Sequence, residues 1–163
     1  MSTLRIILVR HAESTANVDP LNRIGGRNVD IELTERGIEQ ALELGDRLRN
    51  LSFNRIYSSP TARTLSTCRL STWLDPDCIT SELLEADSGD FTGLSRDVYN
   101  RPEIREQLDA DSWNFIPGFD IKGESPSQVA NRMLKWLDSI VATNSTSETI
   151  LVFTHCLAIK YIS

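Results

Sequence analysis

Two short apolar runs, one near each end of the chain, lead into a histidine. Residues 4–9 are followed by Arg10-His11, and residues 149–153 are followed, one position later, by His155. Continuous apolar runs of this length are typical of strands buried on both faces of a parallel sheet. Because the carboxyl ends of parallel strands share one edge, where ligands bind in α/β proteins, we expect the only two histidines of the chain to converge there.

Strand and helix patterns alternate between these two runs. Residues 55–58 are predicted as a second strand, and the apolar patch at residues 79–84 favours a third. This alternation predicts an α/β domain of three layers, with a mostly parallel central sheet flanked by helices. A chain of 163 residues is enough for one hydrophobic core and short for two, so we expect residues 1–163 to form a single domain.

Three predicted helices begin at residues typical of helix starts. Ser59-Pro60 resembles an N-cap followed by proline at the first helical position, which places Arg63 in the first turn. An expected N-cap at Thr34 precedes an apolar helical face made of Ile38, Ala41, Leu42, Gly45, Leu48 and Leu51. The capping-box pattern at residues 125–128 precedes a second such face, made of Val129, Met133, Trp136, Leu137 and Ile140. A short helix is expected near residues 103–108.

The charge balance excludes several classes of function. The net charge is -6 and the sequence pI is about 4.9, so no basic excess exists to bind nucleic acid or an anionic membrane surface. No apolar stretch approaches the roughly 20 residues needed to span a bilayer, and the N-terminus lacks a signal peptide's cleavage pattern. The three cysteines, an odd number without close spacing, suit reduced thiols. These features predict a cytoplasmic protein.

Two arginines join the histidines at the expected edge of the sheet. Arg10 precedes His11, and Arg63 lies near a helix start, where the helix dipole also favours an anion. The planar guanidinium group of arginine suits phosphate oxygens because it donates two parallel hydrogen bonds. A single histidine at a strand end is more often structural than catalytic. Two histidines and two arginines in one pocket indicate phosphoryl transfer, with neutral imidazole as the nucleophile and nearby cations keeping it unprotonated.

Such a reaction also needs an acid that protonates the departing alkoxide. A carboxyl group is the expected donor, and spacing alone does not choose among the candidates Glu13, Glu82, Glu85, Asp87 and Asp90.

Several segments, in order along the chain, carry a family resemblance. They are residues 9–17, 26–37, 58–64, 83–93, 123–125 and 153–156. Together they resemble the motifs of the histidine phosphatase superfamily, the Arg-His-Gly family that includes the cofactor-dependent phosphoglycerate mutases. The resemblance extends from Arg10 to His155, nearly the whole chain.

The resemblance implies a role for each matching residue. His11 would become phosphohistidine, and Glu85, in the stretch that resembles Leu-x-Glu followed by Gly-Asp-x-x-Gly, would be the proton donor. Residues expected to bind the transferring phosphate or the substrate are Arg10, Asn17, Gly26, Arg63 and His155. Glu13 is expected to support the pocket structurally. The resemblance implies no metal and no cofactor, because arginines supply the positive charge.

The chain departs from the family pattern at three places. Ala12 replaces the glycine that follows the nucleophile, a change that an ordinary backbone conformation tolerates. Cys156 follows His155, but neighbouring residues of one strand point to opposite sides, which disfavours a thiol nucleophile; the cysteines also lack zinc-ligand spacing. Family members continue with a further helix and strand, so this chain is expected to be a compact member, a C-terminally truncated one or an incomplete one.

Ala86 bears on the reaction type. Mutases of the family carry basic residues just after the acid, and their absence here favours water as the acceptor, hence a phosphatase acting on a small phosphorylated metabolite. The alternatives are a phosphoglycerate mutase-type phosphotransferase and a non-catalytic phosphate-binding interaction domain. Residues 95–124 are expected to cap the pocket and determine specificity. The residues name no ligand and leave the oligomeric state open.

Overall fold

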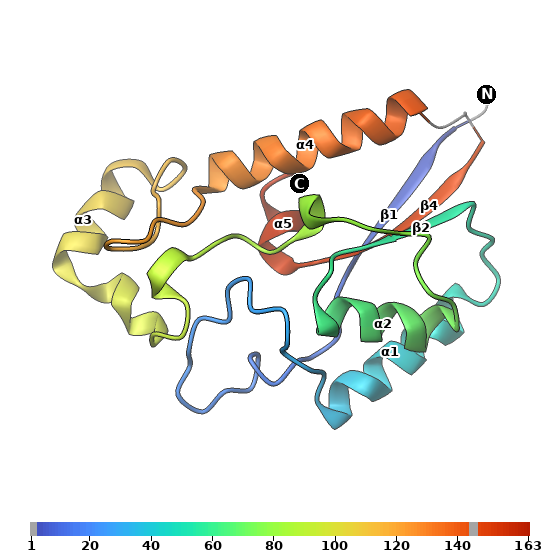
Figure 1. The fold of residues 1–163 in the computed structure, drawn as a ribbon, viewed down its shortest axis with the longest axis horizontal. Coiled ribbons are helices and arrows are strands. Elements are labelled where there is room, and N and C mark those ends of the chain that lie inside the picture. The colour runs from blue at the N-terminus through green and yellow to red at the C-terminus, as the bar shows by residue number, and fades with distance from the viewer. Residues whose placement is uncertain (1–2, 144–146) are drawn as a thin grey trace.

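The sheet sits at the centre of the computed structural model, which describes residues 3–143 and 147–163 (Figure 1). Its strands lie in the order β1-β4-β2-β3, and each of the three strand pairs is parallel. The strands are β1 (Arg5–Arg10), β2 (Arg55–Ser58), β3 (Cys78–Ile79) and β4 (Thr149–Thr154). The predicted α/β class with a parallel sheet is therefore confirmed.

The central strand β4 is covered on both faces. Ile150 and Val152 pack in one apolar cluster with the long helix α4 (Pro126–Thr143). Leu151 and Phe153 pack in another cluster with residues of α1 (Glu35–Leu48) and α2 (Ala62–Thr72). Figure 1 shows α1 and α2 together on one side of the sheet and α4 on the other, which gives the three predicted layers.

Two of the predicted helix starts are confirmed in detail. The Thr34 hydroxyl accepts a hydrogen bond from the Gly37 amide at 2.9 Å, as an N-cap does. Ser125 and Gln128 form the reciprocal pair of a capping box: the Ser125 amide donates to Gln128 Oε1 at 2.8 Å, and the Gln128 amide donates to Ser125 Oγ at 3.2 Å.

The predicted start of α2 is wrong by two residues, since the N-cap is Thr61 and the helix begins at Ala62. Ser59 remains tied to the sheet, because its amide donates to the Phe153 carbonyl at 3.0 Å. Arg63 nevertheless lies in the first turn, as predicted.

The predicted strand at residues 79–84 is also wrong beyond Ile79. A 3₁₀ turn (Ser81–Leu83) replaces it, and the Thr80 hydroxyl caps that turn by accepting a hydrogen bond from the Glu82 amide. The apolar character of this segment comes from burial of Leu83 in the cluster beneath α4 rather than from strand pairing.

The apolar face predicted for α1 is only partly buried. Ile38, Leu42 and Leu51 are about 40% exposed, whereas Ala41 and Leu48 are buried. Helices α1 and α2 approach so closely that a Cβ atom on Gly45 would lie 2.9 Å from the Ser71 carbonyl oxygen, so small residues make the contact.

Strand β1 is half-buried rather than fully buried, because it lies at the edge of the sheet.

Residues 95–124 lie at the end of the molecule away from the sheet (Figure 1). They contain the 3₁₀ turn η3 (Arg96–Asn100) and helix α3 (Pro102–Asp111), which includes the predicted helical segment. Val98, Ile104 and Phe115 of this part form an apolar cluster with Ile24 and Phe91, which lie earlier in the chain. In the part of the chain that the structure describes, no helix is both long and apolar enough to cross a bilayer.

Candidate active site

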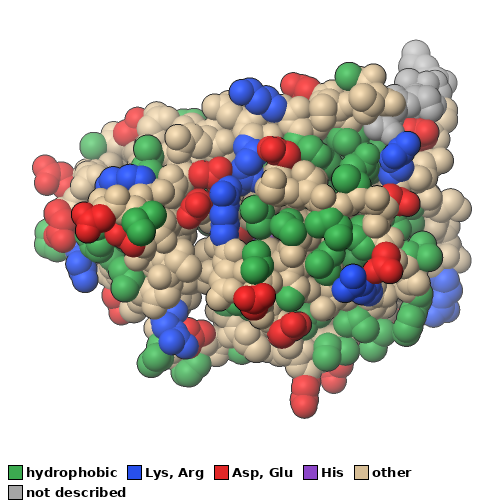
Figure 2. Space-filling view, viewed as in Figure 1, with side chains coloured by type: hydrophobic (Ala, Val, Ile, Leu, Met, Phe, Trp, Pro, Cys, Tyr) green, Lys and Arg blue, Asp and Glu red, His purple; other side chains and the backbone are tan. Residues whose placement is uncertain are grey.

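The two histidines meet where the strands end, as predicted. Arg10 pairs with Thr154 in the register of β1 and β4, so His11 and His155 leave the sheet side by side. Their ring centroids are 5.3 Å apart and the rings are inclined at 63°. Both side chains are buried, His11 at 7% exposure and His155 at 0%, and neither is visible on the face drawn in Figure 2.

The hydrogen bond of His11 determines which of its nitrogens can react. Nδ1 lies 2.7 Å from the Ala12 carbonyl oxygen, which can only accept, so Nδ1 carries the hydrogen and Nε2 keeps the lone pair. Burial lowers the pKa of His11 to about 4, helped by the positive charges of Arg63 and Arg10 and opposed by the bond to Ala12. The imidazole is therefore neutral near pH 7, the state that a nucleophile requires.

His155 is held by one contact and is free at its other nitrogen. Its Nε2 lies 2.9 Å from the Ser59 hydroxyl, whereas Nδ1 is buried without a hydrogen-bond partner among the described residues. Burial lowers its pKa to about 2, with Arg63 as the next cause. An unpaired polar atom in a buried site is costly, which indicates that a ligand completes its bonding.

A cavity of about 230 Å³ opens beside His11. Every residue predicted for the site lines it except His155, whose ring is in edge-to-face contact with the His11 ring. The predicted residues that line it are Arg10, His11, Asn17, Gly26, Arg63 and Glu85.

The two arginines present guanidinium groups in different environments. Arg63 is 4% exposed, and its Nη1 and Nη2 donate to the carbonyls of Asn28 and Gly26 at 2.7 and 3.3 Å. Burial lowers its pKa, although the Glu85 carboxylate partly opposes this. Arg10 is exposed at the mouth of the cavity and forms no ion pair with the described residues. Both can therefore hold an anion.

Asn17 and Gly26 complete the anion-binding side of the cavity. The Asn17 Oδ1 accepts from the Ser14 amide and hydroxyl at 2.9 and 3.0 Å, which leaves the amide NH₂ for a ligand. Gly26 has φ +52°, and a Cβ atom there would lie 2.5 Å from the Thr92 hydroxyl oxygen. Only glycine suits this position.

Glu85 is the carboxyl group that the structure brings into the cavity. Burial raises its pKa, while hydrogen bonds from the amides of Ala86, Leu157 and Ala158 oppose the shift. A half-buried carboxyl group with a raised pKa can hold a proton and donate it to a leaving group.

Glu13 lies outside the cavity lining, and its carboxylate accepts a hydrogen bond from the hydroxyl of Thr34, the N-cap of α1, at 2.7 Å. The Asp90 carboxylate accepts hydrogen bonds from the amides of three successive loop residues, Phe119, Asp120 and Ile121.

A family model of the histidine phosphatase superfamily, branch 1, matches residues 6–163. The chain belongs to this superfamily. Three similar proteins illustrate its range. A probable phosphoglycerate mutase GpmB of Erwinia tasmaniensis is 31% identical over 166 residues, covering 96% of this chain and 71% of the relative.

Two solved structures have the same fold. Bacillus stearothermophilus YhfR superposes with a TM-score of 0.83 at 29% identity, covering 98% of this chain and 78% of that one. A phosphoserine phosphatase from Entamoeba histolytica, in complex with 3-phosphoglyceric acid, superposes with a TM-score of 0.81 at 26% identity. The match covers 98% of this chain and 77% of that one.

An ion-pair network holds the segment that carries Glu85, and sequence reasoning missed it. Arg27 Nε donates to the Glu85 carbonyl at 3.0 Å, and its Nη2 binds Glu124 at 2.6 Å. Arg132 binds the same carboxylate at 3.0 Å and donates to the Leu84 carbonyl at 3.2 Å. The signal was present: Arg27 and Glu124 belong to segments that resemble family motifs.

Cys156 requires a correction. It is not on the strand but is the first residue of α5 (Cys156–Lys160), and it is an exposed part of the cavity lining. The argument that strand geometry turns its thiol away therefore does not hold.

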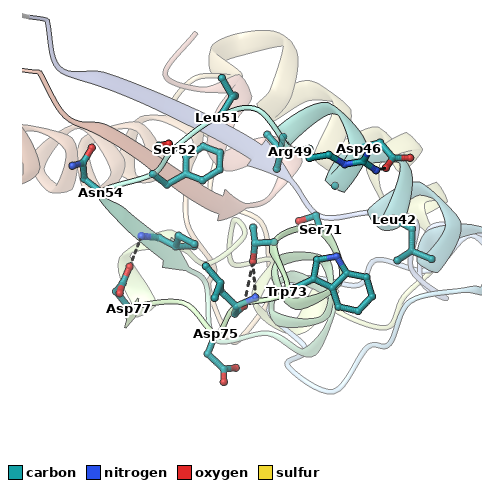
Figure 3. Close-up of a pocket in the computed structure, with 16 residues that line it drawn as sticks. Leu42, Asp46, Arg49, Leu51, Ser52, Asn54, Ser71, Trp73, Asp75 and Asp77 are labelled. Carbon is teal, nitrogen blue, oxygen red and sulfur yellow. Dashed lines mark hydrogen bonds and ion pairs between the residues drawn. The ribbon is translucent and has the colours of Figure 1, made fainter.

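A larger cavity, of about 830 Å³, lies elsewhere, between the C-terminal ends of α1 and α2 (Figure 3). Its lining residues include no histidine and no cysteine. Asp46 pairs with Arg49, and Asp77 accepts the Ile56 amide at 2.7 Å. Since these charged groups bind one another or the backbone, the smaller cavity beside His11 is the better candidate for the reaction.

The histidine pKa values can be tested directly because the chain contains only two histidines. In NMR titrations of ¹³C-histidine-labelled protein, we expect midpoints near 4 for His11 and lower still for His155, both below the ordinary 6.5. Since these folded-state pKa values lie below the unfolded ones, the neutral rings stabilise the fold above about pH 6.5, and this stability falls as the pH approaches 4. Arg10→Met should raise the midpoint of His11. A His11 midpoint at or above 6.5 would contradict the assigned neutral state.

Ser59 is predicted to position His155. In Ser59→Ala, we expect kcat to fall about tenfold with little change in KM, because the His155 ring loses its one hydrogen bond. The ¹⁵N shifts of His155 should change from one tautomer to a mixture. The matched control is Ser58→Ala, which removes a buried hydroxyl that bonds only to the Ser59 carbonyl. Equal effects of both variants on kcat and on the shifts would argue against the positioning role.

Proposed function

We propose that this chain is a phosphatase that hydrolyses a phosphomonoester of a small metabolite through a phosphohistidine on His11. The observation that carries the proposal is the pairing of a neutral His11, with its Nε2 lone pair available, and a half-buried Glu85 of raised pKa in one arginine-lined cavity. Phosphoryl transfer without a metal ion requires three kinds of group: a nucleophile, an acid and cations.

In the first step, His11 Nε2 attacks phosphorus, a P–N bond forms, and the bond to the leaving oxygen breaks. Glu85 transfers its proton to that oxygen, so an alcohol departs rather than an alkoxide. Arg10, Arg63 and the amide of Asn17 donate to the equatorial oxygens, where negative charge accumulates.

His155 is proposed to donate from Nδ1 to the transferring phosphate. This role fits a hydrogen bond in which the Ser59 hydroxyl donates to Nε2, which leaves the proton of the neutral ring on Nδ1.

In the second step, water attacks phosphorus and the P–N bond breaks. The Glu85 carboxylate, left ionised by the first step, accepts a proton from the water, which restores both Glu85 and His11 and releases phosphate. The raised pKa of Glu85 favours this exchange, because a carboxyl group can serve as acid and then as base only if neither form is strongly preferred.

We favour water over a second substrate as the acceptor of the phosphoryl group because of Ala86, the residue that follows Glu85. Ala86 is buried and lines the cavity, so it offers no charge to a carboxylated second substrate. The similar proteins carry both kinds of name, mutase and phosphatase. The mutase alternative predicts interconversion of 3- and 2-phosphoglycerate without net release of phosphate.

We further propose that residues 95–124 cap the site within a single domain. Arg96 and Tyr99, both from η3, line the cavity beside His11, which supports a role of this segment in substrate selection.

The experiment that tests the proposal combines phosphate release with intermediate trapping. The protein is mixed with p-nitrophenyl phosphate, quenched in alkali within milliseconds, and analysed by mass spectrometry for an acid-labile, alkali-stable phosphate on His11. Phosphate release together with this adduct supports the proposal. Binding of inorganic phosphate without any turnover would support the non-catalytic alternative instead.

A further inference from the structure

A second cavity, of about 390 Å³, adjoins the phosphate cavity. The residues that line both are Ala86, Ser88, Arg96, Tyr99 and Leu157. Glu85 lies at this shared wall, since it precedes Ala86 and its carboxylate accepts the Leu157 amide at 3.2 Å. The proton donor must reach the oxygen between phosphorus and the leaving group. A phosphate beside His11 would therefore direct its leaving group toward the second cavity.

Four aromatic rings, those of Tyr99, Trp113, Phe115 and Tyr161, line this second cavity. The ring centroids of Tyr99 and Phe115 are 6.5 Å apart, in edge-to-face contact. Those of Trp113 and Tyr161 are 6.1 Å apart in the same arrangement. These residues come from η3, from the chain after α3 and from the chain after α5, so three separate segments supply one aromatic wall. Trp113 is 47% exposed although large, which leaves ring surface available for a ligand.

The charges of the cavity are unequally compensated. Its charged lining residues are Asp87, Glu124, Arg96 and Lys160. Both carboxylates already bind Arg27, Asp87 at 3.6 Å and Glu124 at 2.6 Å. Arg96 and Lys160 form no ion pair with the residues that the structure describes. In a chain with a net charge of -6, two unpaired cations beside an aromatic wall favour an anionic ligand.

We propose that the substrate is a phosphomonoester of an aromatic alcohol that carries a second anionic group, such as a carboxylate. Its ring packs on Trp113 and Tyr161, and its anionic group binds Lys160 and Arg96. The inference rests on the proposed phosphatase activity, because it assigns the leaving-group site of that reaction. Small polar esters would fill the phosphate cavity and leave the aromatic one empty.

A series of three alkyl phosphates tests the inference with leaving groups of similar acidity. They are ethyl phosphate, benzyl phosphate and 4-carboxybenzyl phosphate. We expect kcat/KM to rise about tenfold from ethyl to benzyl and about tenfold again on adding the carboxylate. Two variants separate the contributions. Trp113→Leu should reduce the benzyl-to-ethyl ratio to about two, and Lys160→Met should remove most of the gain from the carboxylate.

Trp73→Leu is the matched control, because Trp73 is 78% exposed and lines only the remote cavity between α1 and α2. It should leave both ratios unchanged. Equal kcat/KM for ethyl and benzyl phosphate would overturn the aromatic site, and equal values for benzyl and 4-carboxybenzyl phosphate would overturn the anionic one, while the phosphatase activity itself would stand. If no ester is hydrolysed, p-nitrophenyl phosphate included, the proposed function fails and this inference fails with it.

Discussion

Replacement of His11 by alanine is expected to reduce kcat for every phosphomonoester by at least about 10⁴-fold and to abolish the phosphohistidine adduct. In the proposed reaction the His11 imidazole forms the covalent intermediate through its free Nε2 lone pair, and the alanine methyl group cannot replace it. The measurement is steady-state phosphate release together with the alkaline quench.

Phosphate binding by the pocket serves as the control for His11→Ala. The arginines and Asn17 remain, so the variant should still bind inorganic phosphate in calorimetric titration and should keep a cooperative thermal unfolding transition. Turnover in His11→Ala within tenfold of the parent protein would refute the nucleophile assignment. An exposed thiol, Cys156, lines the same cavity, and a thiophosphate adduct on it would identify the group that acts instead.

Replacement of Glu85 by glutamine is expected to lower kcat/KM for benzyl phosphate by about 10³-fold and for p-nitrophenyl phosphate by less than about tenfold. The amide keeps the size of the side chain but cannot transfer a proton, and the nitrophenolate departs without one. The raised pKa of Glu85 also predicts that kcat/KM for the alkyl ester falls on the alkaline side, as the carboxyl group ionises above its ordinary 4.5.

Glu82→Gln is the matched control for this variant, since Glu82 lies on the same segment but is exposed and outside the cavity lining. It should leave both substrates unaffected. Equal losses for benzyl and p-nitrophenyl phosphate in Glu85→Gln would mean that the residue shapes the site rather than acting as the acid.

Much of the fold was predictable because its signals are local. The run at residues 149–153 becomes the buried central strand, and Thr34 and the pair Ser125 and Gln128 cap helices through atoms a few residues away. The errors arise where distant groups decide. Residues 79–84 turn away from the sheet because Leu83 is buried beneath α4, and Ser59 stays extended because it bonds to β4.

The same distinction between local and distant signals applies to the site. The residues proposed to perform the chemistry were identifiable from their types and their order, since imidazole, guanidinium and carboxyl groups followed strand and helix ends in a family pattern. Their support was not. Arg27 and Glu124 are 97 residues apart along the chain, and nothing local in either segment indicates that they hold the Glu85 loop.

By itself, the sequence determined the family and the parallel α/β class and indicated the groups that we propose to react, because strand pattern, capping residues and motif order are properties of neighbouring residues. Only the tertiary structure decided which nitrogen of His11 is free, how far burial shifts the histidine and glutamate pKa values, and where the aromatic cavity lies. These three properties depend on desolvation and on contacts between segments distant in sequence. Such contacts exist only once folding has brought Arg10-His11 beside His155 and the strand that precedes it.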